Sequence, residues 1–269
     1  MIRSVLAKNS SKMNSETEQQ LPKINFSGLA VGTPEWIAVR VEVMNALHIY
    51  GSFEAVYDPL QDPKLREKVF KKGITELFDL PVDVKSRSAS YSNKLYVPSA
   101  QVEDKYYDEM NQKTKYILNA SCYKSEEKED KDEQYMGAHT DPNFITIIGQ
   151  DEVDGLEVLI KTGQWIRPAP YCYIVLIADA MEAWTNGKLQ ATGHRVIKNK
   201  SNDTRYVTLF MSTGTKGFII QTPPELIDAT HPPLYKPSDF NDYFQFYSSE
   251  MSFKTTTPLK TFCGIDDLV

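Results

Sequence analysis

The sequence predicts a mainly β protein with an α-helical flank: a distorted double-stranded β-helix, or jelly roll, with N-terminal helices. Two observations predict this fold class. From residue 135 to residue 222, short apolar runs rich in β-branched and aromatic residues alternate with turn sequences such as Val153-Asp154-Gly155 and Asn186-Gly187. Before residue 123, many apolar residues instead recur at helical spacing. Short strands at close spacing are typical of a β-sandwich or jelly roll.

The composition limits the class of partner. A chain of 269 residues fits one large domain, and 41% hydrophobic residues are ordinary for a globular protein. The net charge of −6 argues against nucleic acid as the main partner. Mean hydropathy is −0.42, and no apolar run approaches the roughly 18 residues of a membrane helix. The three cysteines are scattered and lack CxxC spacing, so we expect a reducing, cytoplasmic environment.

We expect four regions along the chain. They are a disordered N-terminal extension (1–20), an α-rich flank (21–123), a jelly-roll core (135–222), and a C-terminal helical segment and tail (223–269). Residues 1–12 are positively charged and lack the apolar stretch of a secretory signal. This pattern favours a disordered tail over an organelle transit segment.

In the flank, helix and strand signals follow each other. Thr33 and Pro34 are typical of a helix start and Gly51 of a helix stop, so we expect a helix between them. Apolar spacing predicts two more helices, over residues 62–80 and 102–120. Short strands are expected at residues 21–28 and 52–58, and the charged residues 124–134 are expected to form a solvated loop.

The core is expected to contain seven strands. Each is a short run of β-branched and aromatic residues bounded by turn residues: 144–149, 155–160, 164–168, 171–178, 194–198, 205–211 and 217–221. Since helices precede these strands, we expect a helical flank laid against one β core.

Two histidines and one aspartate in the core are candidates for a metal site. His139 and Asp141 are two positions apart, so on a strand their side chains point to the same face. His194 opens a later strand, 53 positions after Asp141, which leaves room for the chain to return to the same place. Two histidines and one carboxylate on one face of an iron ion form the facial triad of non-haem Fe(II) oxygenases. The alternative is that they are ordinary loop and strand residues.

Arg205 and Tyr123 are candidates for binding a carboxylate. Arg205 begins the strand after His194, and an inward arginine there can clamp a carboxylate with two hydrogen bonds. The Tyr123 hydroxyl can donate to the same group. The alternatives are a surface ion pair for Arg205 and a core position for Tyr123.

The stretch from residue 137 to residue 196 resembles the plant 2-oxoglutarate- and Fe(II)-dependent dioxygenases. GAHTDPNFITIIGQDEVDGLEV, WIRPAP and NGKLQATGHRV are similar to the core of that family in order and spacing. GTPEW, FEAVYD, PPELIDATHPPLYKP and LKTFCGI resemble the clade of glucosinolate side-chain dioxygenases more closely. This likeness begins near Met13, so residues 1–12 read as an upstream extension.

The resemblance implies roles for the candidate residues. His139, Asp141 and His194 would bind Fe(II), and Arg205 would grip the far carboxylate of 2-oxoglutarate with help from Tyr123. Phe144 and Phe210 fall near positions that line the substrate pocket in relatives. The implied cosubstrates are 2-oxoglutarate and O₂, with ascorbate as reductant. The implied reaction is hydroxylation, desaturation or cleavage of a small molecule of plant specialised metabolism.

The sequence departs from the family in two places. The family usually has a serine two positions after the arginine, where this chain has Val207. Between Tyr96 and Val102, near residues 97–101, a block of about fifty residues is skipped. These departures keep open an alternative, a catalytically degenerate, truncated jelly-roll paralogue that acts as a binding protein. We expect a monomer, or an oligomer if the skipped block bares core surface.

Overall fold

The computed structural model describes residues 20–80, 104–124, 134–198, 203–250, 252 and 255–264. The expected N-terminal extension (except Gln20), the skipped block near residues 97–101 and most of the charged loop at 124–134 lie outside the described residues. Among the described residues, no helix has both the length and the apolar character needed to cross a membrane.

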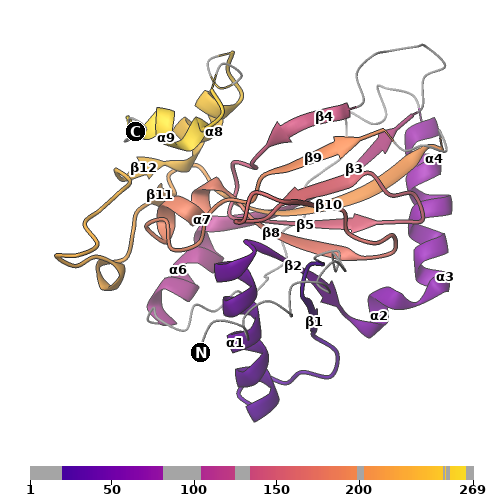
Figure 1. The fold of residues 1–269 in the computed structure, drawn as a ribbon, viewed down its shortest axis with the longest axis horizontal. Helices are drawn as coiled ribbons and strands as arrows, with labels where there is room; N and C mark the ends of the chain where they lie inside the picture. The colour runs from indigo at the N-terminus through magenta and orange to yellow at the C-terminus, as the bar shows by residue number, and fades with distance from the viewer. Residues whose placement is uncertain are drawn as a thin grey trace, which may run out of the picture.

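Two sheets form the centre of the molecule (Figure 1). The larger sheet has six strands in the order β1-β2-β8-β5-β10-β3, and the smaller has four in the order β4-β9-β6-β7. All pairs in both sheets are antiparallel except the pair β1–β2. The strands of the larger sheet are β1 (Lys23–Asn25), β2 (Ser52–Val56), β8 (Tyr173–Ile177), β5 (Ile145–Gln150), β10 (Arg205–Gly214) and β3 (Thr114–Tyr123). Those of the smaller sheet are β4 (Gln134–His139), β9 (His194–Ile197), β6 (Leu156–Leu159) and β7 (Trp165–Ile166).

Helices and a small third sheet surround this centre. β11 (Ile219–Ile220) and β12 (Ser238–Asp239) form the third sheet. The helices of the N-terminal flank are α1 (Pro34–Ile49), α2 (Asp58–Gln61), α3 (Pro63–Arg66), the π-helical η1 (Glu67–Ile74), α4 (Thr75–Asp79) and α6 (Asp104–Lys113). The later ones are α7 (Asp179–Trp184), the 3₁₀-helical η2 (Pro224–Leu226), α8 (Phe240–Tyr247) and α9 (Pro258–Cys263).

The predicted boundaries of the first helix are confirmed. The Thr33 hydroxyl accepts a hydrogen bond from the backbone N–H of Trp36, and Pro34 occupies the first turn of α1. Gly51 has a φ of +77° just after the helix, which only glycine adopts without strain. A Cβ atom at Gly51 would also lie 2.9 Å from the hydroxyl oxygen of Thr192. The stop is therefore fixed both by the backbone and by a close neighbour from the core.

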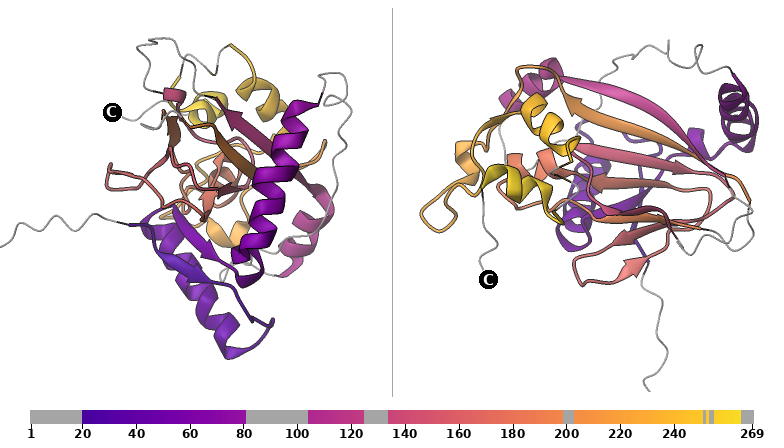
Figure 2. Two further views of the ribbon diagram at one scale, coloured as in Figure 1. Left: turned by 90° about the vertical axis from the view of Figure 1, so that its right-hand side faces the viewer. Right: turned by 90° about the horizontal axis from the view of Figure 1, so that it is seen from above.

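The helix predicted over residues 62–80 is present as a continuous stretch from α3 through η1 to α4. Its middle turns are π-helical, and Phe70 and Ile74 are its buried residues in η1. Seen from the right-hand side of Figure 1, this stretch runs across the front of the sheets (Figure 2, left). The Arg66 guanidinium donates a hydrogen bond to the backbone carbonyl of Gln150, the last residue of β5. The stretch thereby covers one end of the larger sheet.

The helix predicted over residues 102–120 is wrong beyond residue 113. α6 ends at Lys113, and Thr114–Tyr123 form strand β3 at the edge of the larger sheet. β3 pairs with β10 without interruption, from Tyr123 opposite Arg205 to Thr114 opposite Gly214. Ten residues of backbone hydrogen bonding to a neighbour distant in sequence outweigh a weak local helix preference. The other strands predicted from residue 21 onward are confirmed in position; most have shorter bounds, whereas β10 runs three residues further than predicted and β5 is shifted by one residue.

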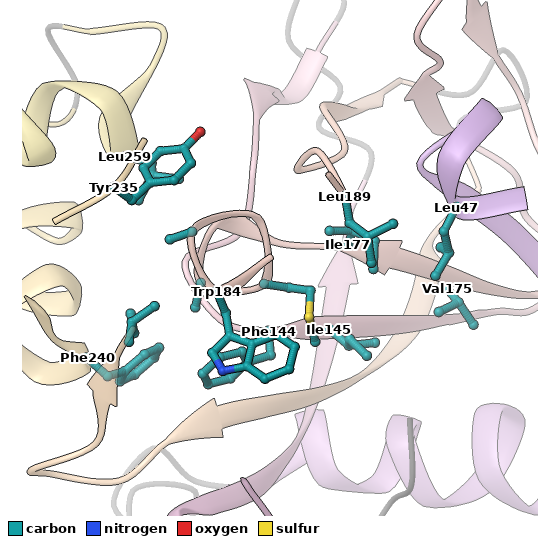
Figure 3. Close-up of a cluster of buried hydrophobic side chains, with 14 of the residues drawn as sticks. Leu47, Phe144, Ile145, Val175, Ile177, Trp184, Leu189, Tyr235, Phe240 and Leu259 are labelled. Carbon is teal, nitrogen blue, oxygen red and sulfur yellow. The ribbon is translucent and has the colours of Figure 1, made fainter. Parts of the chain in front are cut away.

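Two hydrophobic clusters divide the interior. The inner core lies between the two sheets and includes Ile148, Ile174 and Val207 of the larger sheet and Leu156 and Val158 of the smaller. The outer core lies on the other face of the larger sheet, where α1, α7 and α8 cover it. Figure 3 shows this cluster, with Leu47, Phe144, Ile145, Trp184 and Phe240 among its members. The central strands β5 and β8 thus bury both faces, and alternate residues belong to different cores.

Candidate metal centre

His139 and His194 are brought side by side by strand pairing. His139 ends β4, His194 opens β9, and the two are register partners in the smaller sheet. Their ring centroids are 4.3 Å apart. His194 is buried and His139 is partly exposed. Two histidines that are distant in the sequence therefore form one pair of imidazoles, as predicted.

Asp141 completes the cluster predicted from the sequence. One carboxylate oxygen, Oδ1, lies 3.9 Å from Nε2 of His139 and 3.9 Å from Nε2 of His194. One candidate ligand atom from each residue lies within 4.8 Å of the others. This is the only such group of three histidine, cysteine or acidic residues among the described residues. Two imidazole nitrogens and one carboxylate oxygen converging on one point fit an Fe(II) ion with open positions for other ligands.

The ring orientation of both histidines is set by the backbone. Nδ1 of His139 lies 2.8 Å from the carbonyl oxygen of Gly137, and Nδ1 of His194 lies 3.2 Å from that of Thr192. A carbonyl only accepts, so each Nδ1 carries the proton and each Nε2 keeps its lone pair for a metal. Burial also lowers the pKa of His194, which favours the neutral form that a metal requires.

The carboxylate is oriented by a neighbouring strand. The Thr146 hydroxyl of β5 donates a hydrogen bond of 2.5 Å to Oδ2 of Asp141. This leaves Oδ1, the oxygen nearest the two imidazoles, available to a metal. Thr146 has no exposed surface, so the hydroxyl is held in place by the core.

The segment that carries His139 and Asp141 is braced by the C-terminal part of the chain. The Tyr247 hydroxyl of α8 donates a 2.6 Å hydrogen bond to the carbonyl oxygen of Thr140. The Tyr243 hydroxyl donates to the carboxyl group of Asp179, whose backbone N–H donates to the carbonyl oxygen of Asp141. Burial of Asp179 raises its pKa to about 7. Helix α8 therefore holds in place the backbone segment that carries the ligands His139 and Asp141.

Arg205 is a buried cation that forms no ion pair with any described residue. Its side chain is 1% exposed, and Nη2 donates a 2.8 Å hydrogen bond to the amide oxygen of Gln150. Nε is buried and has no hydrogen-bond partner within the described parts of the chain. Burial lowers the pKa of Arg205, the direction that a desolvated cation shows. A buried guanidinium without a counter-charge is costly, so this site is suited to an anionic ligand.

Tyr123 is the cross-strand partner of Arg205. The guanidinium carbon lies 5.4 Å from the centre of the Tyr123 ring, within the range of a cation–π contact. Burial raises the pKa of Tyr123, whereas Arg205 and a hydrogen bond with the Ser121 side chain lower it, and the net shift is upward. Tyr123 therefore stays protonated and able to donate. The structure brings the predicted carboxylate-binding pair together.

Arg205 lies on the same face of the larger sheet as Thr146. Gln150, which holds Arg205, is four residues beyond Thr146 on β5, a separation of about 14 Å along the strand. Asp141 and Arg205 stand at the two ends of this span, because Thr146 binds the carboxylate and Gln150 binds the guanidinium. The site therefore offers metal ligands at one end and a guanidinium at the other, the two groups that a 2-oxo dicarboxylate would need. The chemistry of the residues therefore fits 2-oxoglutarate.

The family serine has no substitute on β10. Val207 stands at its position, is 1% exposed and belongs to the inner core, on the face of Arg205. Thr208 lies on the opposite face, as the strand alternation predicts: its hydroxyl oxygen would clash with a Cβ atom at its register partner Gly149, the residue before Gln150. The hydroxyl of Thr208 therefore cannot take the place of the missing serine.

The two predicted substrate-pocket phenylalanines are not brought to this face. Phe144 has no exposed surface and packs in the outer core against Phe218 and Phe240. Phe210 lies on the face of β10 opposite to Arg205 and stacks on Tyr116, at a centroid distance of 5.3 Å. The structure therefore separates both rings from the metal ligands.

Several residues of the site were missed by the sequence analysis. They are Ser121, Thr146, Gln150 and Asp179, together with the two tyrosines of α8. The pairing of β10 with β5 and β3 brings the first three to the inner face. Alternation along GAHTDPNFITIIGQ could have placed Thr146 and Gln150 on one face, but no local signal shows which face receives the metal.

Comparisons with known proteins agree with this geometry. Residues 109–213 match the model of the 2OG-Fe(II) oxygenase superfamily. The chain is 31% identical over 296 residues to the probable 2-oxoglutarate-dependent dioxygenase AOP1 of Arabidopsis thaliana, covering 86% of this chain and 97% of that protein. It is 42% identical over 132 residues to the dioxygenase AOP3 of the same plant, a match that covers 48% of this chain and 32% of AOP3.

Solved structures show the same fold. The dioxygenase for auxin oxidation of rice superposes with a TM-score of 0.65 at 22% identity, covering 88% of this chain and 97% of that one. The dioxygenase for auxin oxidation 1 of Arabidopsis thaliana, solved in a complex with 2-oxoglutarate, superposes with a TM-score of 0.59 at 19% identity, covering 79% and 100%. These likenesses confirm the double-stranded β-helix. By the match to AOP1 over nearly its whole length, the chain belongs to the 2OG-Fe(II) oxygenase superfamily, among the plant Fe(II)- and 2-oxoglutarate-dependent dioxygenases.

Proposed function

We propose that this dioxygenase oxidises a C–H bond of a small molecule of plant specialised metabolism, by hydroxylation, desaturation or side-chain cleavage. His139, Asp141 and His194 hold Fe(II), and Arg205 and Tyr123 hold the far carboxylate of 2-oxoglutarate. The observation that supports this most is the buried Arg205, which has no counter-ion among the described residues and lies on the inner face shared with Thr146. The family and the AOP relatives support the reaction class.

When bound, Fe(II) would activate O₂ as the oxidant, with two electrons supplied by 2-oxoglutarate as it is converted to succinate and CO₂ and two by the substrate. The protein contributes position and protection. Thr146 turns one carboxylate oxygen of Asp141 toward the metal position. Gln150 fixes the Arg205 guanidinium, which would anchor the far carboxylate of 2-oxoglutarate in one position. The inner core behind Val207 keeps water from that face.

The remaining partners follow from the same proposal. We propose ascorbate as the reductant that keeps the iron in the Fe(II) state, and a monomer in the cytoplasm without a nucleic-acid or membrane partner. The alternative of a degenerate paralogue has no support in the site, because the three metal-ligand candidates converge and Arg205 remains buried beside Tyr123.

An anaerobic titration with Fe(II) and 2-oxoglutarate tests this proposal. We expect a weak visible charge-transfer band that saturates with 2-oxoglutarate. Asp141→Ala should abolish the band, and Arg205→Ala should require roughly a hundredfold more 2-oxoglutarate. A folded wild-type protein that gives no band would contradict the proposed site. A band that persists in Asp141→Ala would place the metal elsewhere.

A further inference from the structure

Position 207 has two neighbours in the sheet that present polar side chains to the same face. Val207 of β10 is the register partner of Ser121 on β3 and of Gln150 on β5. Residues directly opposite one another on adjacent strands present their side chains to the same face. Ser121, Val207 and Gln150 therefore form one row across the sheet. The next row along contains Tyr123 and Arg205, which are partners in the same way.

The hydroxyl in this row belongs to Ser121. Ser121 is two residues before Tyr123 on β3, so its side chain lies on the same face as the tyrosine that contacts Arg205. The side chain of Gln150 lies on the other side, where its amide oxygen accepts from Nη2 of Arg205. The guanidinium is thus held between an amide and an aromatic ring, and Ser121 lies in the neighbouring row on the same face.

Ser121 is also more accessible than position 207. Val207 is 1% exposed, whereas Ser121 is only partly buried. Directly opposed residues of antiparallel strands have Cα atoms about 4.5–5.5 Å apart. A serine hydroxyl on β3 can therefore reach a ligand that a hydroxyl at position 207 of β10 would reach.

We propose that Ser121 donates to the far carboxylate of 2-oxoglutarate the hydrogen bond that relatives obtain from a serine at position 207. This inference rests on the proposed binding of that carboxylate by Arg205. In this chain the hydroxyl has moved across one register pair, from β10 to β3, and a valine fills the vacated position. The absence of a serine at position 207 is then compensated by the hydroxyl of Ser121, and it does not indicate that the carboxylate site has been lost.

Calorimetric titration of the Mn(II)-loaded protein tests the exchange. The ligands are 2-oxoglutarate and 2-oxopentanoate, which has the same 2-oxoacid end but no far carboxylate. Ser121→Ala should bind 2-oxoglutarate about ten- to a hundredfold more weakly and leave 2-oxopentanoate unchanged. Adding Val207→Ser to Ser121→Ala should restore most of the affinity for 2-oxoglutarate. Thr208→Val, which removes a hydroxyl from the opposite face of β10, is the matched control and should bind both ligands as the wild type does.

The outcomes separate this inference from the proposed function. Unchanged affinity for 2-oxoglutarate in Ser121→Ala overturns the role of Ser121, as does an equal loss for both ligands. If Arg205→Ala still loses 2-oxoglutarate in that case, the proposed carboxylate site stands. If Arg205→Ala binds 2-oxoglutarate normally, the proposed function itself fails. Ser121→Cys, nearly the same size with a weak donor, replaces Ser121→Ala should the alanine variant fail to fold.

Discussion

His139 and His194 are register partners across β4 and β9, and their rings lie 4.3 Å apart. Two of the three proposed iron ligands are therefore fixed relative to each other by backbone hydrogen bonding within one sheet. Asp141 follows β4 by two residues and is oriented from the other sheet, through Thr146 of β5. The proposed metal site thus joins the two sheets of the jelly roll at one end.

Removing the Thr146 hydroxyl should weaken metal binding without removing a ligand. Thr146→Val frees the second carboxylate oxygen of Asp141, so the carboxylate can rotate away from the imidazoles. We expect about a tenfold to hundredfold loss of Fe(II) or Mn(II) affinity, measured by calorimetry. Thr146→Ser keeps the hydroxyl and should stay close to the wild type. Equal affinities for Thr146→Val and wild type would show that Asp141 needs no such support.

The C-terminal helix should influence the metal site through Tyr247. Tyr247→Phe removes the hydrogen bond to the carbonyl of Thr140, between the two ligands of the His-x-Asp segment. We expect a loss of about 1 kcal/mol in the free energy of unfolding and a several-fold weaker metal affinity. Tyr57, which is 42% exposed, provides the control as Tyr57→Phe. If Tyr247→Phe matches this control in both measurements, α8 does not brace the site.

Gly155 should be required for the position of Arg205. Its φ is +141°, and a Cβ atom there would lie 2.9 Å from the carbonyl oxygen of Ile197 and 3.2 Å from Cδ of Arg205. Gly155→Ala should therefore lower both the melting temperature and the affinity for 2-oxoglutarate. Gly163 has a φ of +84°, but a Cβ atom there would meet no heavy atom within 4 Å. Gly163→Ala should lower stability alone, because it adds backbone strain without displacing Arg205.

The ion pairs of Glu157 should make a contribution to the free energy of unfolding that depends on pH. Burial opposes ionisation of Glu157, but hydrogen bonds from Arg167 and Arg195 outweigh it, and the net effect lowers the pKa. A carboxyl group with a lowered pKa stabilises the fold above its unfolded pKa, near 4.5, and loses this contribution as pH falls through the folded value. Glu157→Gln should therefore lower the unfolding free energy by about 1 kcal/mol at pH 7.

Denaturant titrations of wild type and Glu157→Gln at pH 7 and below about pH 4 check this prediction. The difference between the two proteins should shrink at the lower pH, where the wild-type carboxyl is also protonated. A difference that stays constant with pH would assign the loss to packing and not to charge.

The sequence alone determined the parts of this protein whose signals are local. A helix cap at Thr33, a helix stop at Gly51 and the short apolar runs of the core are local signals, because each depends on a few neighbouring residues. The corresponding helix and strands are present as predicted. The iron-ligand candidates could also be named in advance, because a chain with four histidines offers few choices and the His-x-Asp spacing fixes a common face.

Tertiary structure decided the features that depend on strand pairing. Nothing local in Thr114–Tyr123 distinguishes a strand from a helix, and only the ladder with β10 settles it. The same pairing places Ser121 beside Val207 and turns Phe210 away from Arg205, since a strand assigns alternate residues to opposite faces. Which face of a strand lies in the interior depends on where the second sheet packs. The strands of that sheet are distant in sequence, so no pattern within a single strand contains this information.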